Sequence, residues 1–319
     1  MEKVWIQCGV LKFPKRSPSL VYSDKHLISL GGFSDDETPS NGVFAYSLQT
    51  EEWKTLKPMS VPRVDLCVVI VNKFIYVLGE SGSNPCVALK TAEKFNHCTR
   101  QWISLPDMFM ARSQATAVAL DDQIYIMGGL ASNGRPLKSV ECFNTITGKW
   151  DRCGDMIQPR FDFGAAFFKG LLYVIGSGNT MHSMHSLSCS VECYNPKTNT
   201  WSQAASINVP RYGICGITLT DRLMAIGGTT LTDFKGIIEV YKPTKNSWLQ
   251  GKPLPMGGNY RCFVVPSKEL TEIQSKPNEI VIAPKRLLHT SLLLLMRMYF
   301  FIRWLLCLGK CIILWTIRN

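Results

Sequence analysis

Hydrophobic and polar positions follow one fixed order along most of the chain, and residues 112–150 show it clearly. Arg112 is followed by an apolar run, a short polar turn and a second run of β-branched and aromatic residues that ends at Gly128. A third apolar segment contains Phe143, and Trp150 stands seven residues further on. Short apolar runs bounded by turn residues are typical of β-strands, so this segment predicts four short strands.

The same order recurs in five copies. The second run stops at a glycine, which is Gly31, Gly79, Gly128, Gly176 or Gly227. An aromatic residue precedes a tryptophan by seven positions, in the pairs Tyr46 and Trp53, Phe95 and Trp102, Phe143 and Trp150, Tyr194 and Trp201, Tyr241 and Trp248. An arginine follows the first four tryptophans by ten positions, at Arg63, Arg112, Arg160 and Arg211. A regular spacing of 47 to 51 residues indicates a repeat architecture.

A four-stranded repeat of this kind predicts an all-β propeller. A lone four-stranded sheet cannot bury both of its faces, whereas sheets arranged radially as blades bury them against one another. Each aromatic–tryptophan pair supplies large apolar area for the contact between blades. We therefore expect the five repeat tryptophans to be largely buried.

The double glycine and the spaced aromatic–tryptophan pair resemble the Kelch repeat family, over roughly residues 5–265. The resemblance implies a Kelch β-propeller. Two copies depart from the pattern, because Glu80 and Ser177 replace the second glycine. We expect those two turns to be strained or locally rearranged, since glycine adopts positive φ angles more easily than other residues.

The ends of the repeat region contain only parts of a sixth copy. Trp5 followed by Arg16 resembles the end of one repeat, and Arg261 resembles the start of another. We expect a propeller over residues 1–266 with five complete four-stranded blades and an incomplete sixth made from both termini. Two alternatives remain open: a fragment or alternative form of a longer protein, and a five-bladed ring.

Beyond the propeller, the sequence predicts a polar linker over 267–286 and a hydrophobic, basic tail over 287–319. Residues 287–317 are long enough to span a bilayer, but Arg297 and Arg303 oppose insertion. A tail anchor, an interfacial helix and a non-native extension remain alternatives. Membrane association through 287–317 is therefore one expectation for this tail.

Composition narrows the class of partner. The net charge is +11, but six basic residues and no acidic residue fall within 285–319, so the propeller shows no sign of a nucleic-acid surface. Most of the twelve cysteines lie within strand patterns, where a reduced thiol behaves as a small apolar group. The residues after Met1 lack the pattern of a secretory signal, so we expect a cytoplasmic protein.

No catalytic constellation is apparent in the sequence. It has no G-x-S-x-G segment, no paired-histidine helix and no phosphate-binding glycine loop. The five histidines are scattered, at His26, His97, His182, His185 and His289. The sequence therefore predicts no enzyme activity, no cofactor and no metal site.

The V-E-x-aromatic strand of the repeats resembles that of the BTB–BACK–Kelch proteins. This resemblance implies a protein-interaction module that receives the substrate of a cullin-type ubiquitin ligase. The BTB and BACK domains that contact the cullin in that family are absent from this sequence. The alternative is an actin-binding or scaffolding Kelch protein.

The resemblance also implies where a partner binds. In Kelch substrate receptors, matching arginines reach the mouth of the central channel and hold acidic peptides, and guanidinium groups suit carboxylates and phosphates. An acidic or phosphorylated peptide partner is therefore expected, and a double Arg112 and Arg160 variant is expected to keep its fold. The candidate partner-binding residues are Arg16, Arg63, Arg112, Arg160, Arg211, Arg261, Phe33, Ser81 and Thr229.

One alternative for these arginines stays open, in which each only pairs with an acid of a neighbouring blade. Four glutamates lie two positions before the strand aromatic and need a partner that the sequence does not identify: Glu93, Glu141, Glu192 and Glu239.

Overall fold

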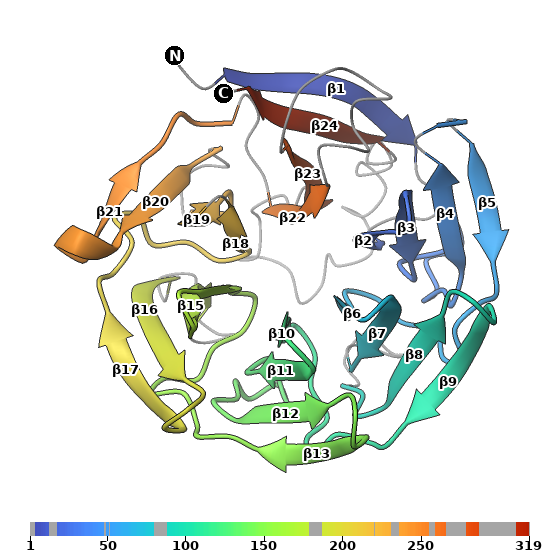
Figure 1. Ribbon diagram of the computed structural model, residues 1–319, viewed down its shortest axis with the longest axis horizontal. Coiled ribbons are helices and arrows are strands. Elements are labelled where there is room, and N and C mark those ends of the chain that lie inside the picture. Colours follow the sequence, from blue (N-terminus) through green and yellow to red (C-terminus); the bar gives the residue numbers. More distant parts are fainter. Residues whose placement is uncertain are drawn as a thin grey trace, which may run out of the picture.

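The computed structural model describes residues 4–12, 18–47, 49–50, 52–79, 88–178, 187–219, 221–230, 236–254, 259–265, 279–286 and 311–318. Before residue 18 and after residue 254, only the backbone is described. The chain forms a β-propeller whose sheets are arranged radially around a central axis (Figure 1). Both the all-β class and the five predicted four-stranded blades are confirmed.

Each blade is an antiparallel sheet whose strands follow chain order from the centre of the propeller outward. Blade 1 contains β2 (Ser19–Ser23), β3 (His26–Leu30), β4 (Val43–Ser47) and β5 (Trp53–Leu56). Blade 2 contains β6 (Cys67–Val71), β7 (Phe74–Leu78), β8 (Ala92–Asn96) and β9 (Gln101–Leu105). Blade 3 contains β10 (Thr116–Leu120), β11 (Gln123–Met127), β12 (Val140–Asn144) and β13 (Lys149–Arg152). Blade 4 contains β14 (Gly164–Phe168), β15 (Leu171–Gly178), β16 (Leu187–Asn195) and β17 (Thr200–Ala204). Blade 5 contains β18 (Cys215–Leu219), β19 (Arg222–Ile226), β20 (Ile238–Lys242) and β21 (Ser247–Gln250), with a short 3₁₀ turn at Pro243–Lys245.

The hydrophobic core lies in the seams between blades. One cluster joins Val69 and Tyr76 of blade 2 to Ile124 and Phe143 of blade 3. Similar clusters join blade 1 to blade 2, blade 3 to blade 4 and blade 4 to blade 5. The second strand of each blade is therefore mostly apolar, because both of its faces are covered.

Each tryptophan of the repeat packs on its aromatic partner, with ring centroids 4.9–5.2 Å apart. The indole N–H of Trp150 donates to the carbonyl of Pro106 in the preceding blade, at 2.8 Å, and Trp102, Trp201 and Trp248 make equivalent bonds. Trp150 and Trp248 are buried, as predicted. Trp53, Trp102 and Trp201 are only half-buried, so the expected burial is confirmed for two of the five repeat tryptophans.

The glycine stop of blade 3 allows a close approach between blades. Gly128 has a φ of +56°, and a Cβ atom there would lie 2.4 Å from the carbonyl oxygen of Arg160. Ser177 replaces the second glycine of blade 4, and there β15 and β16 continue pairing past a bulge between Ile175 and Ser177. The predicted rearrangement is confirmed at Ser177, whereas Glu80 lies outside the described residues.

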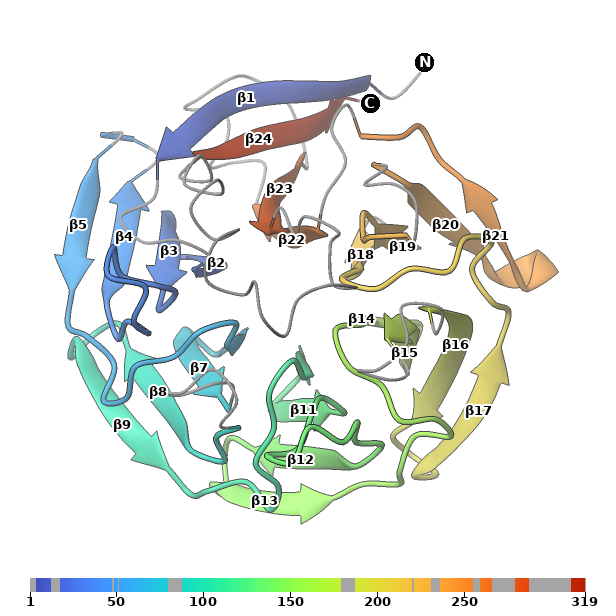
Figure 2. The same ribbon diagram turned by 180° about the vertical axis from the view of Figure 1, so that it is seen from behind.

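The sector between blades 5 and 1 contains strands from both ends of the chain (Figures 1 and 2). β1 (Val4–Lys12) pairs with β24 (Cys311–Arg318), and β22 (Asn259–Val265) pairs with β23 (Glu279–Arg286). Among the described residues of this sector, these strands form two separate two-stranded sheets and no continuous four-stranded blade. Two of its strands come from the segments that the sequence predicted as linker and tail.

The predicted membrane-associated stretch falls mostly on residues 287–310, which lie outside the described part of the chain. Within the described ranges, no helix has the length and apolar character needed to cross a bilayer.

Candidate functional site

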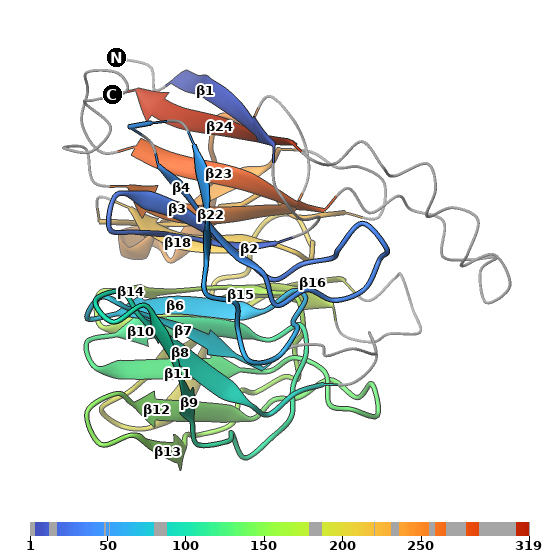
Figure 3. The same cartoon turned by 90° about the vertical axis from the view of Figure 1, so that its right-hand side faces the viewer.

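The two faces of the propeller carry different connections (Figure 3). In each four-stranded antiparallel blade, the turns after the first and third strands lie on one face. The loop after the second strand and the crossover to the next blade lie on the other, which we call the crossover face. Four crossovers are described throughout, over residues 57–66, 106–115, 153–163 and 205–214. Each crossover enters an innermost strand, so its last residues lie near the propeller axis on this face, an area that we call the mouth.

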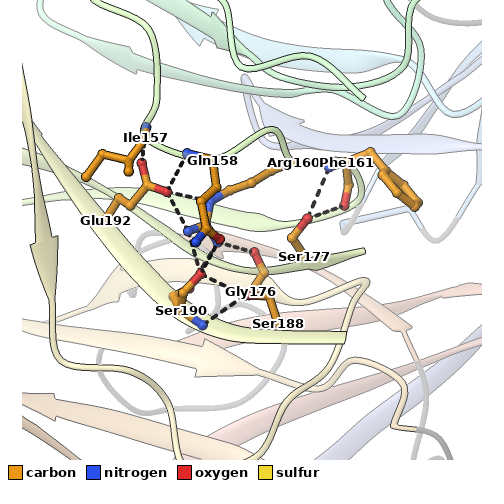
Figure 4. Close-up of polar contacts among 9 residues, drawn as sticks. All are labelled: Ile157, Gln158, Arg160, Phe161, Gly176, Ser177, Ser188, Ser190 and Glu192. Atoms are coloured by element: carbon orange, nitrogen blue, oxygen red, sulfur yellow. Dashed lines mark hydrogen bonds and ion pairs between the residues drawn. The ribbon is translucent and has the colours of Figure 1, made fainter. Parts of the chain in front are cut away.

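Arg160 is the centre of a buried polar cluster beneath this face (Figure 4). Its Nη1 donates to the carbonyls of Gly176 and Ser190, at 2.8 and 3.0 Å. Its Nη2 donates to the Ser190 hydroxyl and to Glu192 Oε1, both at 2.7 Å. Arg160 is fully buried, and the Glu192 side chain is only 2 % exposed. The ion pair therefore neutralises both charges inside the protein.

Glu192 also holds the crossover itself. Its carboxylate accepts the backbone N–H groups of Ile157 and Gln158, at 2.7 and 3.1 Å. The carboxylates of Glu93, Glu141 and Glu239 accept backbone N–H groups of the other three crossovers in the same way. These glutamates, whose partners the sequence left unidentified, thus each join an arginine to a crossover.

The backbone of the arginine belongs to the preceding blade. Gly129 N–H donates to the Arg160 carbonyl at 2.7 Å, and Arg160 N–H donates to the Leu137 carbonyl at 3.0 Å. Because the side chain of Arg160 bonds to blade 4 while its backbone bonds to blade 3, the residue joins two blades. Arg63 has the same arrangement, with its carbonyl accepting from Gly32 and its side chain paired with Glu93.

In blade 5 the arginine side chain, that of Arg211, is also bound by a buried glutamate, but its other hydrogen-bond partners differ. Ile237 stands where Thr91, Ser139 and Ser190 supply hydroxyl groups in blades 2 to 4. Arg211 turns so that Nε donates to the Gly227 carbonyl at 2.8 Å, and Asn208 Nδ2 donates to Glu239 Oε2 at 2.7 Å. Burial lowers the pKa of Arg211, although Glu239 acts in the opposite direction and keeps the pair ionic.

The structure places the predicted partner-binding residues as follows. Arg63, Arg112, Arg160 and Arg211 are at most 1 % exposed and paired with glutamates. Thr229 is 1 % exposed and bonded through its backbone to Tyr212, and Phe33 is half-buried. Arg16 and Ser81 lie outside the described residues, and only the backbone of Arg261 is described.

This geometry favours the alternative in which the four arginines pair with acids and join blades. It also removes the reason for expecting a double Arg112 and Arg160 variant to keep its fold, because each change would leave a buried carboxylate unpaired. The prediction of an acidic or phosphorylated partner loses its basis in these side chains, because their charges are already neutralised.

Three half-buried residues directly after the arginines border the mouth instead, and we call them the mouth residues: Ser113, Phe161 and Tyr212. The Phe161 ring points away from the ion pair of Arg160 (Figure 4). Burial, and next the charge of Asp162, raise the pKa of Tyr212, although a side-chain hydrogen bond with Thr229 acts in the opposite direction.

Neighbouring crossovers are bonded to one another beside the mouth residues. Asp162 N–H donates to the Gln114 carbonyl at 3.0 Å, and Gly213 N–H donates to the Asp162 carbonyl at 2.7 Å. Gln114, Asp162 and Gly213 all have positive φ angles. The three equivalent positions thus share one backbone conformation, and their hydrogen bonds link neighbouring crossovers around the mouth.

Sequence reasoning missed the mouth residues because it assigned the mouth to the arginines. The available signal was the position after each arginine, where an aromatic residue stands in two repeats. Among the described residues, no three His, Cys, Asp or Glu side chains are grouped as metal ligands. The described mouth offers aromatic surface and hydrogen-bonding groups, which suit binding to another chain.

The fold is a β-propeller whose crossovers are held by buried ion pairs, and comparison with known proteins identifies its family. A family model described as the KLHDC2/KLHL20/DRC7 Kelch-repeats domain matches residues 17–228. The chain therefore belongs to the Kelch-repeat family, whose propellers are protein-binding domains.

The chain is similar to Alpha-scruin of Limulus polyphemus, with 28% identity over 221 residues, covering 65% of this chain and 24% of that protein. It is similar to Kelch-like protein 23 of Homo sapiens, with 24% identity over 254 residues, covering 78% of this chain and 44% of that protein. The chain thus spans less than half the length of each of these relatives. The solved structure titled "Structure of YjhT" has a TM-score of 0.64 at 15% identity, covering 75% of this chain and 84% of that one, and shares the fold.

Proposed function

We propose that the propeller binds a segment of a partner protein at its mouth, as the substrate-recognition part of a cullin-type ubiquitin ligase adaptor. One observation supports this binding site: the mouth residues are half-buried, and buried ion pairs hold the crossovers on which they lie. Recognition residues on a rigid scaffold lose little conformational entropy on binding. The adaptor role is supported by the relation to Kelch-like protein 23 and by the resemblance to BTB–BACK–Kelch proteins.

Replacing Phe161 and Tyr212 together with alanine is expected to weaken partner binding at least tenfold, which corresponds to about 1.4 kcal/mol. The reason is the loss of the two aromatic groups at the mouth, while the buried arginines stay in place. Quantitative affinity capture from a cytoplasmic extract, followed by binding measurements on the captured protein, provides the test.

Ile146→Ala is the matched control, because Ile146 is 75% exposed and lies in the turn after the third strand of blade 3, on the opposite face. Melting temperatures of both variants show whether they are folded. If the folded mouth variant captures the same proteins as the control, the site lies elsewhere.

The captured partner also distinguishes the adaptor role from the actin alternative. A ligase substrate is expected to persist longer in cells when cullin activation is inhibited. Co-sedimentation with filamentous actin, and no change in partner lifetime, would instead support the scaffolding role.

A further inference from the structure

Two cysteines lie side by side in the seam between blades 3 and 4. Cys142 is in β12, directly opposite Asp151 of β13. Cys153 is the first residue after β13, and its N–H donates to the Val140 carbonyl at 3.0 Å. Opposed residues of an antiparallel ladder project to the same face, as do residues two positions apart, so both thiols project towards blade 4. There they join the cluster that contains Tyr194.

The two thiols influence each other's pKa, and they differ in exposure and acidity. Cys142 is buried, with Sγ 2.8 Å from Gln123 Oε1, while Cys153 is half-buried. The hydrogen bond with Cys142 lowers the pKa of Cys153, although burial opposes this effect. The same hydrogen bond, together with burial, raises the pKa of Cys142. Cys153 is therefore the thiol that ionises first and the one nearer to solvent.

We propose that Cys142 and Cys153 are a redox pair that peroxide converts reversibly into an intramolecular disulfide. The Cys153 thiolate attacks one oxygen of hydrogen peroxide, the O–O bond breaks, and a sulfenic acid and hydroxide form. The Cys142 sulfur then attacks the sulfenic sulfur and displaces hydroxide, which leaves as water with the Cys142 proton. In net terms, two thiols and one peroxide give one disulfide and two waters, and a dithiol reductant reverses the reaction.

Formation of the disulfide would affect the crossover face, because Cys153 is the first residue of a crossover. Diagonal neighbours on paired strands have Cα atoms about 7–8 Å apart, whereas a disulfide needs about 4.4–6.8 Å. Cys153 therefore has to shift slightly towards Cys142. Since Cys153 begins the crossover that carries Arg160 and Phe161, oxidation alters the start of that crossover. The pairing of the thiols does not depend on the proposed function.

The experiment uses the full chain, treated with graded hydrogen peroxide, blocked with N-ethylmaleimide and digested with trypsin without reduction. Cleavage after Lys138, Lys149, Arg152 and Arg160 places each cysteine alone in its own peptide, 139–149 or 153–160. Mass spectrometry is expected to find these peptides linked, and dithiothreitol is expected to separate them. In Cys142→Ser, Cys153 is expected to stop at the sulfenic acid, which dimedone traps.

Blade 4 provides an internal control, because Cys193 occupies the strand position of Cys142 but Ala204 stands where blade 3 has Cys153. Cys193 is expected to remain unlinked. The inference is overturned if peptides 139–149 and 153–160 stay unlinked at a peroxide concentration that oxidises the exposed Cys98. It is overturned as well if Cys193 forms disulfides as abundant as the linked pair, since that result indicates exchange in unfolded molecules.

Discussion

Replacing Arg160 with alanine is expected to lower the free energy of unfolding by about 3–5 kcal/mol, because it leaves a buried charge without a partner. Glu192 would remain in place at 2 % exposure, and the carbonyls of Gly176 and Ser190 would lose their donors. Equilibrium denaturation in urea measures the effect directly. A change of this size is a large fraction of the stability of a typical domain.

Two further variants distinguish the effect of losing the Arg160–Glu192 ion pair on stability from the general effect of removing an arginine. Arg135→Ala removes an exposed arginine of blade 3 and is expected to change stability by less than about 0.5 kcal/mol. Arg160→Met combined with Glu192→Leu removes both charges and is expected to cost less than Arg160→Ala alone. If Arg160→Ala keeps wild-type stability and loses partner binding, the arginine contacts the partner, as the resemblance first implied.

Replacing Trp150 with alanine is also expected to cost about 3–5 kcal/mol, as is typical for a large buried aromatic residue. Trp150 is 8% exposed and packs on Phe143 at 4.9 Å between ring centroids. Its indole also bonds to Pro106, so the change removes both packing area and a polar link between blades 2 and 3. Thermal and chemical denaturation check the size of the loss.

Trp150→Phe separates the two contributions, because it keeps most of the apolar area and removes the N–H donor. It is expected to cost about 1 kcal/mol for the lost hydrogen bond, plus a smaller packing change. A Trp150→Ala protein with near-wild-type stability would contradict the assignment of this residue to the core between blades.

The blades could be predicted from the sequence because local geometry requires particular residues at fixed spacing. Gly128 is needed where no Cβ fits beside the Arg160 carbonyl, and Trp150 is needed to cover the seam. The same glycine and tryptophan positions recur in every repeat, so they are visible in the sequence as residues at regular spacing. At Ser177, where the second glycine of the repeat is absent, the strand pairing differs and continues past a bulge.

The role of the arginines could not be settled from the sequence, because it depends on contacts between distant residues. Arg160 and Glu192 are 32 positions apart, and nothing in either segment shows that they meet beneath the mouth. The proximity of Cys142 and Cys153 was missed for the same reason, because it depends on the pairing of β12 with β13. The leucine-rich end of the chain, in turn, has a composition that fits a helix or a strand, and Cys311–Arg318 forms a strand.

The central claim is that the partner binds at the mouth, above arginines that hold the blades together. Its most direct test is photo-crosslinking of the captured partner from a benzophenone amino acid placed at position 161, compared with the same group at position 146 on the opposite face. The account predicts crosslinks to the partner from position 161 and none from position 146. Crosslinks from position 146 alone would contradict it.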